Sequence, residues 1–488
     1  MTAVEHGRAD RPATGSADEV NPYLTGIFAP VRDEITADDL EVIGEIPRDL
    51  NGVYLRNGPN PRYAPQGRYH WFDGDGMVHA MSFENGMARY RNRYIRTRGL
   101  SREEQAGAPL WTGMIENPAG NPRGTARGLP FKDTANTDLT FHRGRVLATW
   151  YLCGQPMAMD PLSLETLGAE TFLNTLHGDV MAHPKLDERT GELMWFDYGT
   201  SDPLLRYGVV GAAGAIEHEV AIDLPGPRMP HDMAITENYS VLMDLPLVAD
   251  PEAARNGRHK LMFDRSMPSR FGVIPRRGAA SEIRWFEASP CYIYHVVNAW
   301  EQGSTVVLDV CRVARPEPRP TRPGPMGKLL GYLKLTAHLH RYEFDMATGT
   351  TTETQLDDVN AEFPTIDSRG QGTPDRYAYG VHIADAETVR FSGLWRRDAT
   401  TGQRTDHWFG DGRFGSEAPF APRDGSTGSG DGYLVSFVTD ERAGRSEVEI
   451  LDAADLSAGP VARVRLPQRV PLGFHATWVR PDQFRTVP

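Results

Sequence analysis

The chain has 488 residues, of which 40% are hydrophobic and 24% charged, and its formal net charge is −13. These proportions are typical of a globular protein that buries a large core. Nucleic-acid-binding proteins usually carry a basic patch or stripe. The acidic balance and the lack of a sizeable basic run therefore argue against a nucleic-acid partner.

The three cysteines, Cys153, Cys291 and Cys311, are few, odd in number and widely spaced. This pattern argues against a disulfide framework and predicts a reducing, cytoplasmic location. Residues 1–20 are rich in Ala, Asp, Glu and Gly and are expected to form a flexible tail, without the apolar centre of a signal peptide. No run reaches the roughly 18 apolar residues of a membrane span.

From residue 21 onward the pattern is one of short strands separated by turns. Runs rich in Val, Ile, Tyr, Phe and Thr alternate with turn signals, and the chain contains 49 Gly and 37 Pro. Long amphipathic helical patterns are nearly absent. Examples of predicted strands are residues 52–58, 77–83, 145–152, 240–247, 305–313 and 433–440. The pattern predicts an all-β protein, with residues 21–488 forming a single domain.

A weak internal repeat refines this prediction. Strands that end in Asp, turn and continue as a second strand recur at residues 158–170, 343–355, 396–408 and 450–464. Repeated strand–turn–strand units favour a β-propeller. An irregular array of β-sandwich sheets is the alternative that the repeat leaves open.

Two segments interrupt the strands, at roughly residues 97–131 and 315–337. Long insertions on a rigid scaffold commonly build lids and channels, so both segments are expected to form a cap. The second contains an apolar patch beside two lysines, made by Met326, Leu329, Leu330, Tyr332, Leu333, Lys328 and Lys334. The patch is compatible with a weak peripheral membrane contact, although packing onto the protein's own core is the favoured interpretation.

Four histidines lie in distinctive settings of small, acidic or aromatic residues next to predicted strands: His183, His231, His295 and His475. A single histidine in a β-rich protein is usually an ordinary core or surface residue. The separations of 48, 64 and 180 residues are too long for a zinc finger or an H-E-x-x-H site. They suit ligands that separate blades deliver to a common axis. Four imidazoles suit iron among other metals, and Fe(II) with an open position would let dioxygen bind.

A ligating imidazole needs an acceptor for its second N–H, which is often a carboxylate. Glu362 in AEFPTID and Glu417 in GSEAPFAP stand in apolar surroundings and are candidates for this role. Two other classes of site lack their motifs, because the chain has neither a G-x-S-x-G elbow nor a phosphate-binding G-x-x-x-x-G-K-[ST] loop.

At these residues the sequence resembles the carotenoid cleavage oxygenases, a family of non-haem iron enzymes. The resemblance runs from NPYLTGIFAPVRDEI (21–35) through AHPKLDERTGEL (182–193) and HDMAITENYSVLMDLPL (231–247) to FHATWV (474–479). It implies a seven-bladed β-propeller with a cap of loops and short helices over the metal face. It also implies Fe(II) held by the four histidines, with Glu362 orienting His295 and Glu417 orienting His475.

Two departures from the family pattern bear on the site. The third glutamate of the family falls on Tyr151 in LATWYLCGQP, so the acceptor for His231 is expected to be a phenol or a backbone carbonyl. Relatives that cleave lignostilbenes commonly place Lys where this chain has Trp150, which favours an apolar substrate here. Thr137 falls near the open iron position. The remaining candidates for the substrate pocket are Trp111, Phe72, Tyr63 and Tyr94.

These observations lead to one main hypothesis and two alternatives. The main hypothesis is an Fe(II)-dependent dioxygenase that cleaves a conjugated C=C bond of a carotenoid or apocarotenoid, with dioxygen as co-substrate. The first alternative is the same chemistry on a stilbene or phenylpropenoid such as a vinylphenol. The second is a non-catalytic propeller that binds a polyene, which the loss of the glutamate at Tyr151 would favour. The sequence leaves the oligomeric state open.

Overall fold

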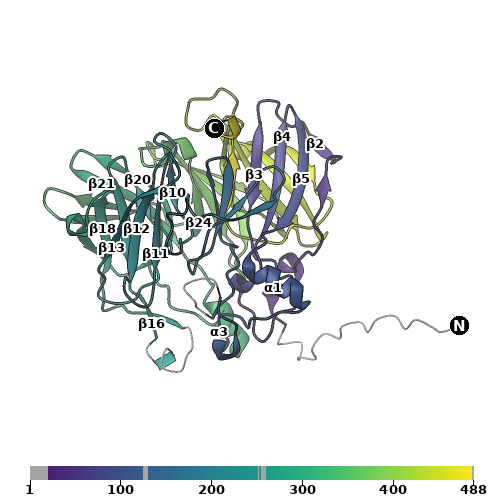
Figure 1. Ribbon diagram of the computed structural model, residues 1–488. Helices are drawn as coiled ribbons and strands as arrows, with labels where there is room; N and C mark the ends of the chain where they lie inside the picture. The colour runs from purple at the N-terminus through teal and green to yellow at the C-terminus, as the bar shows by residue number, and fades with distance from the viewer. Residues whose placement is uncertain (1–19, 125–129, 251, 254–259, 486–488) are drawn as a thin grey trace.

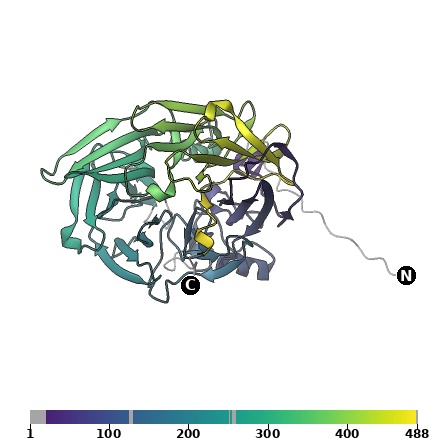
Figure 2. The same ribbon diagram turned by 90° about the horizontal axis from the view of Figure 1, so that it is seen from above.

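The computed structural model describes residues 20–124, 130–250, 252–253 and 260–485. The predicted flexible tail lies outside the described residues, apart from residue 20. Seven antiparallel sheets surround a common axis (Figure 1). Figure 2 shows the same molecule from above. The predicted all-β class and seven-bladed propeller are confirmed.

Each blade is described here from one edge of its sheet to the other. The first blade comprises β33 (Ala476–Val479), β3 (Gly52–Arg56), β4 (Met77–Glu84), β5 (Met87–Tyr94) and β1 (Thr36–Ala37); the second, β6 (Asp138–His142), β7 (Arg145–Thr149), β8 (Met157–Met159) and β9 (Thr166–Ala169); and the third, β10 (Lys185–Asp187), β11 (Glu192–Tyr198), β12 (Leu205–Val210) and β13 (Ile216–Ile222). The fourth blade comprises β14 (Ala234–Ile235), β15 (Tyr239–Asp244), β18 (Ser269–Pro275) and β19 (Arg284–Ala288); the fifth, β20 (Tyr292–Gln302), β21 (Thr305–Val313), β22 (His338–Asp345) and β23 (Thr351–Gln355); and the sixth, β24 (Ala361–Thr365), β25 (Tyr377–Ile383), β26 (Phe391–Asp398) and β27 (Arg404–Trp408). The seventh blade comprises β28 (Arg413–Phe414) and β29 (Phe420–Pro422), which both pair with β30 (Gly432–Asp440), followed by β31 (Arg445–Asp452), β32 (Pro460–Arg465) and β2 (Val42–Gly44).

The two ends of the chain close the ring. The C-terminal strand β33 pairs with β3 of the first blade, and the N-terminal strand β2 pairs with β32 of the last blade. Each of these two blades therefore contains strands from both ends of the sequence. The pairing ties the ends together through backbone hydrogen bonds and places the segment before β33 at the axis.

The internal repeat seen in the sequence corresponds to one hairpin in each of four blades: β8–β9, β22–β23, β26–β27 and β31–β32. In each hairpin the aspartate at the end of the first strand accepts a hydrogen bond from a backbone N–H two residues later. The aspartates are Asp160, Asp345, Asp398 and Asp452. An Asp side chain that bonds its own backbone two residues on favours a turn, which explains why the repeat marks turns.

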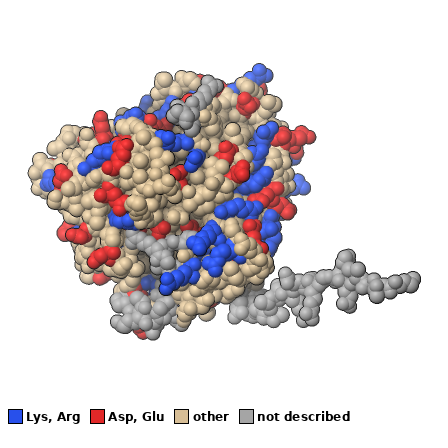
Figure 3. Space-filling model, viewed as in Figure 1, with Lys and Arg blue, Asp and Glu red and all other residues tan. Residues whose placement is uncertain are grey.

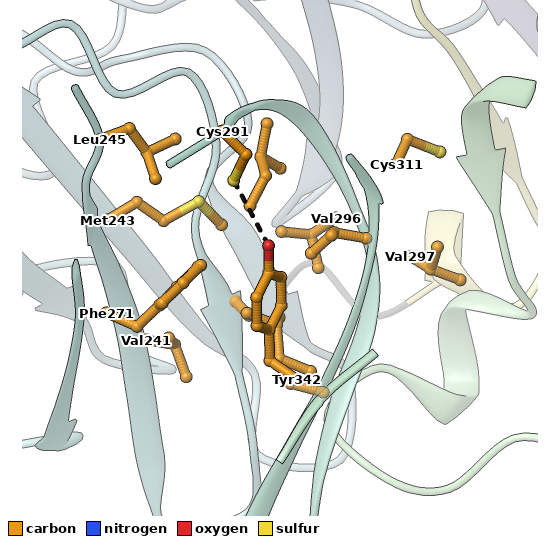
Figure 4. Close-up of a cluster of buried hydrophobic side chains, with 14 of the residues drawn as sticks. Val241, Met243, Leu245, Phe271, Cys291, Val296, Val297, Cys311 and Tyr342 are labelled. Carbon is orange, nitrogen blue, oxygen red and sulfur yellow. Dashed lines mark hydrogen bonds between the residues drawn. The ribbon is translucent and has the colours of Figure 1, made fainter. Parts of the chain in front are cut away.

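Neighbouring blades pack through apolar side chains. Between the blades of β15 and β20, Phe271 and Tyr342 have ring centres 4.6 Å apart, and the Tyr342 hydroxyl lies 3.3 Å from Cys291 Sγ (Figure 4). Cys291 is buried, as are Cys153 and Cys311, and all three are free thiols. The cysteines therefore serve as small core residues and not as cross-links.

A cap covers one side of the propeller, where α1 (Arg98–Ala106), α3 (Pro325–Gly331) and the ribbon of β16 (Leu247–Ala249) and β17 (Leu261–Phe263) lie (Figure 1). Both predicted insertions contribute a helix, although residues 125–129 lie outside the described part. Lys132 forms ion pairs with Asp75 and Glu103 and thereby fastens α1 to the first blade.

The apolar patch of the second insertion is largely turned inward. Leu330 and Leu333 pack in one core cluster with Phe391 and Phe474, while Tyr332 remains 43% exposed. Packing onto the protein's own core therefore accounts for most of the patch. On the face shown in Figure 3, acidic and basic side chains are interspersed over much of the surface.

Candidate metal centre

Four blades each bring one histidine to the axis of the propeller. His183 precedes β10, His231 precedes β14, His295 lies within β20, and His475 immediately precedes β33. All four are buried, with residue exposures of 5%, 4%, 6% and 6% respectively. Each lies on or just before an edge strand of its sheet, so residues that are far apart in the sequence converge on the axis.

The imidazole rings lie close together. Ligand nitrogens of His183, His295 and His475 are all within 4.8 Å of one another. The ring centre of His231 is 5.0 Å from that of His183 and 5.4 Å from that of His295. Two nitrogens bound to one ion at about 2.1 Å are up to about 4.2 Å apart. The arrangement is therefore on the scale of a single metal ion.

Unpartnered ring nitrogens show that the site fits a metal. Within the described part of the chain, Nε2 of His183 and Nε2 of His295 are buried and have no hydrogen-bond partner. A buried polar atom without a partner costs about 1–3 kcal/mol. Coordination of a divalent ion, for which imidazole is a suitable ligand, would remove that cost.

In two of the rings, His295 and His475, a carboxylate contacts Nδ1, the ring nitrogen on the other side from Nε2. Glu362 on β24 contacts Nδ1 of His295, and Oε1 of Glu417 lies 3.1 Å from Nδ1 of His475. Backbone N–H groups of Phe363 and Ala476 also donate to these two carboxylates. The contacts hold the rings with Nε2 directed away from the carboxylates, as ligating histidines require.

A third carboxylate contact was not predicted from the sequence. Asp138, the first residue of β6, places Oδ2 3.2 Å from Nδ1 of His183. The motif ANTDLT reads locally as the start of a strand, and only the neighbouring Thr137 is predicted from the sequence as a candidate site residue. No local signal could identify Asp138, because its partner lies in the next blade.

His231 is the histidine without an acceptor. Its Nδ1 is buried and has no hydrogen-bond partner among the described residues. The Tyr151 hydroxyl donates instead to Met114 Sδ at 2.9 Å, and the Tyr151 ring packs against Phe72 at 4.9 Å between ring centres. The expectation that a phenol or a carbonyl would accept this N–H is therefore not met in the structure.

The electrostatics of the site favour neutral imidazoles at His231 and His295. Burial, with the neighbouring histidines as a further cause, lowers the pKa of His231 and His295 well below the ordinary value. Burial raises the pKa of Glu362 well above its usual range. For His475 burial is outweighed by the charge and contact of Glu417, and the pKa is raised. Neutral rings at His231 and His295 keep lone pairs available for a metal.

A cavity of about 1480 Å³ leads from the histidines to the cap. Its lining includes His231, His295 and His475, and aromatic or apolar residues dominate the remainder. Among the latter are Phe72, Tyr151, Tyr294, Phe363, Phe474, Leu247, Leu261, Phe263, Met326, Leu329 and Leu333, and the polar Thr137 also lines the cavity. Charged residues of the lining, such as Arg68, Asp250, Lys260 and Lys328, come from the cap and the loops around it. An elongated apolar ligand fits such a space.

The structure places the predicted pocket residues in two different cavities. Thr137 and Phe72 line the large one. Tyr63, Trp111 and Trp150 do not; they line a separate cavity of about 60 Å³, which is too small for such a ligand.

Tyr63, Trp111 and Trp150 lie outside the large cavity because their side chains pack into the cap and the first blades. For example, the Trp111 indole N–H donates to the carbonyl of Pro122. Tyr94 lines neither cavity, because it is buried and its hydroxyl donates to the carbonyl of Val31.

The comparisons with known proteins agree with this geometry. A family model described as "Retinal pigment epithelial membrane protein" matches residues 28–480. A carotenoid 9,10(9',10')-cleavage dioxygenase of Crocus sativus is 38% identical over 496 residues, covering 95% of this chain and 90% of that protein. The chain belongs to the carotenoid cleavage oxygenase family. The predicted family is thus confirmed.

Other members of the carotenoid cleavage oxygenase family differ in substrate. An isoeugenol monooxygenase of Pseudomonas nitroreducens is 33% identical and covers 94% of this chain and 98% of its own length. The crystal structure of a lignostilbene dioxygenase from Pseudomonas brassicacearum has a TM-score of 0.84 at 29% identity, covering 94% of this chain and 98% of that one. Among the described residues, no helix is both long and apolar enough to cross a membrane.

Substitution of Tyr151 by Glu is expected to leave iron retention equal to that of the parent or better. A carboxylate here could accept the orphaned N–H of His231, and loss of such acceptors typically weakens metal binding by roughly 10- to 100-fold. Iron per chain after dialysis against a chelator measures the effect, with Tyr151→Phe as the control that removes only the hydroxyl. A clear loss of iron in Tyr151→Glu would show that this position is not simply a vacated glutamate site.

Proposed function

We propose that this protein is an Fe(II)-dependent dioxygenase that cleaves one conjugated C=C bond of a carotenoid or apocarotenoid into two carbonyl products. The reaction consumes one molecule of dioxygen, and each carbonyl product receives one of its oxygen atoms. The observation that carries this proposal is the convergence of four buried histidines, three of which line a large and mainly apolar cavity. The relative from Crocus sativus is named for a cleavage of this kind.

His183, His231, His295 and His475 would hold the iron. When bound, Fe(II) supplies the redox chemistry that activates dioxygen. Around it, the Phe363 ring lies 4.6 Å from the ring centre of His475 and 4.8 Å from that of His295. This side chain shields the site from water, while the apolar lining holds the polyene with one bond at the metal.

The central experiment measures metal and product together. Protein reconstituted anaerobically with Fe(II) is expected to hold about one iron per chain and to convert an apocarotenal under ¹⁸O₂ into two carbonyl products, each carrying one ¹⁸O. Absence of iron after reconstitution would support the non-catalytic polyene-binding alternative. Iron without any cleavage of polyenes or aromatic alkenes would overturn the proposed reaction.

A stilbene or phenylpropenoid substrate is the second candidate. It is favoured by the likeness to a lignostilbene dioxygenase and to an isoeugenol monooxygenase. The position where lignostilbene-cleaving relatives commonly carry Lys is Trp150, which lines the small cavity and cannot offer a cation to a phenol. This observation and the volume of the large cavity, about 1480 Å³, favour a polyene.

Leu329→Asp separates the two substrate classes. Leu329 on α3 is half-buried and lines the cavity at the cap. Loss of its apolar contact should cost a long polyene roughly 1.5 kcal/mol or more, so kcat/KM for a C30 apocarotenal is expected to fall about tenfold. A vinylphenol, which does not reach the cap, should be unaffected.

Met262→Asp is the control, because Met262 is exposed on β17 and faces away from the cavity. An equal loss for both substrates would contradict this assignment of the cavity.

The substrate is expected to be a hydrophobic small molecule that enters through the cap, where Tyr332 and Lys328 are exposed and a weak peripheral membrane contact would form. Flotation with vesicles of neutral and of anionic lipid tests this contact. The free cysteines are compatible with a cytoplasmic location, which cell fractionation tests.

A further inference from the structure

The innermost strands of all seven blades each present one histidine or carboxylate to the axis. In chain order these residues are Asp138 at the start of β6, His183 before β10, His231 before β14, His295 on β20, Glu362 on β24, Glu417 before β29 and His475 before β33. Strands of successive blades contact one another around the ring, as β33 does with β6 and β20 with β24. The order around the axis therefore follows the order in the chain.

This order decides which histidine has a carboxylate beside it. Asp138 lies in the blade next to His183, Glu362 in the blade next to His295, and Glu417 in the blade next to His475. Each of these pairs is in contact. His231 is flanked by His183 and His295, and its Nδ1 has no partner in the described part of the chain.

The Asp138 carboxylate is held in place by the backbone of the next residue. Its Oδ1 accepts from the N–H of Leu139 at 2.8 Å, which leaves Oδ2 facing Nδ1 of His183 at 3.2 Å. The preceding residue, Thr137, receives a backbone hydrogen bond from His475 and donates one to Thr149. The start of β6 is therefore tied both to its own blade and to another histidine of the site.

The backbone conformation of His183 gives a carboxylate contact at its ring a particular importance. Its backbone lies in the left-handed region with φ of +65°, a conformation that non-glycine residues seldom adopt. Residues held in this region persist when the surrounding structure over-determines them. A contact at Nδ1 adds a constraint on the ring that the backbone does not supply.

We propose that Asp138 is a positioning residue of the metal centre, which orients His183 toward the ion and leaves His231 as the only one of the four histidines without a carboxylate partner. The inference rests on the proposed metal site. It does not depend on which alkene is cleaved. The carboxylates are thus paired with His183, His295 and His475, in contrast to a set that would include His231 through a glutamate at position 151.

The test uses Co(II) as the probe, because its ligand-field absorption reports the ligand arrangement without turnover. Full-length protein freed of metal is titrated with Co(II), and the affinity and spectrum of Asp138→Ala and Asp138→Asn are compared with the parent. Asp138→Ala is expected to bind roughly 10- to 100-fold more weakly, with an altered ligand-field band. Asp138→Asn retains an acceptor oxygen of the same shape and should recover much of the affinity.

Two control variants separate positioning from general stability. Asp309→Asn alters an Asp that pairs with Arg341 on β21 and β22, away from the axis, and should bind Co(II) like the parent. Glu362→Ala provides a reference for loss of an established carboxylate contact. Urea unfolding of each metal-free variant checks the fold, and the Asn variant keeps the test valid if the Ala variant does not fold.

Parent-like affinity and spectrum in both Asp138 variants, with clear weakening in Glu362→Ala, would overturn the inference. A parent that binds neither Co(II) nor Fe(II) would overturn the metal site and the inference together. A parent that binds Co(II) but cleaves no alkene would count against the proposed reaction only, since the effect of Asp138 on metal binding would still be measured.

Discussion

Replacement of any one of the four histidines by alanine is expected to reduce iron to near zero and to abolish alkene cleavage. Each ring lies in a buried site, so its loss leaves a cavity in place of a ligand. No other histidine is grouped with these four in the described part of the chain. Elemental analysis of iron per chain, together with product formation under oxygen, measures both losses.

His340→Ala is the matched control for these variants. His340 is also buried, at 8% exposure, but it lies on β22 with its Nε2 3.8 Å from Glu353. Its removal should leave the iron content unchanged, which separates loss of a ligand from loss of a buried imidazole. Full activity in His183→Ala, His231→Ala, His295→Ala or His475→Ala would remove that residue from the proposed site.

Glu362→Ala is expected to weaken metal binding by roughly 10- to 100-fold and to lower kcat through the lost iron. Glu362 is completely buried and contacts both Nδ1 of His295 and the N–H of Phe363. Its removal frees the His295 ring and leaves two buried donors unpaired. Each unpaired donor costs about 1–3 kcal/mol, so the free energy of unfolding should fall as well.

Glu362→Gln keeps an acceptor oxygen of the same length and is expected to lose much less affinity than Glu362→Ala. The control for a change of charge is Glu343→Ala on β22, which is half-buried and distant from the axis. Competition between the protein and a chelator of known affinity measures the binding. Identical affinities for the Ala and Gln variants would show that the contact with His295 does not support the metal.

The all-β class could be predicted from composition and from local pattern. Short runs of β-branched and aromatic residues, bounded by Gly, Pro and Asp, form strands and turns by local preference. The repeated Asp at strand ends marked real turns, because its side chain bonds the backbone two residues on. Such short-range interactions are visible in a window of a few residues.

The four histidines and two glutamates could also be selected in advance. Their local motifs are distinctive, and the family resemblance assigns them one role each. The structure brings His183, His295 and His475 together and sets Glu362 and Glu417 beside two of them. The number of residues between two positions, however, does not show whether their side chains, on different blades, come into contact.

The sequence by itself determined the strands and their turns and supplied the candidate histidines and glutamates of the site, because those depend on local interactions and residue type. Only the tertiary structure decided which partners meet. It placed Asp138 beside His183, left His231 without an acceptor, and assigned Tyr63, Trp111 and Trp150 to a small cavity instead of the large one. The physical reason is that these partners lie far apart in the sequence, mostly on different blades of a ring that β33 and β2 close, and such long-range contacts are encoded by no local pattern.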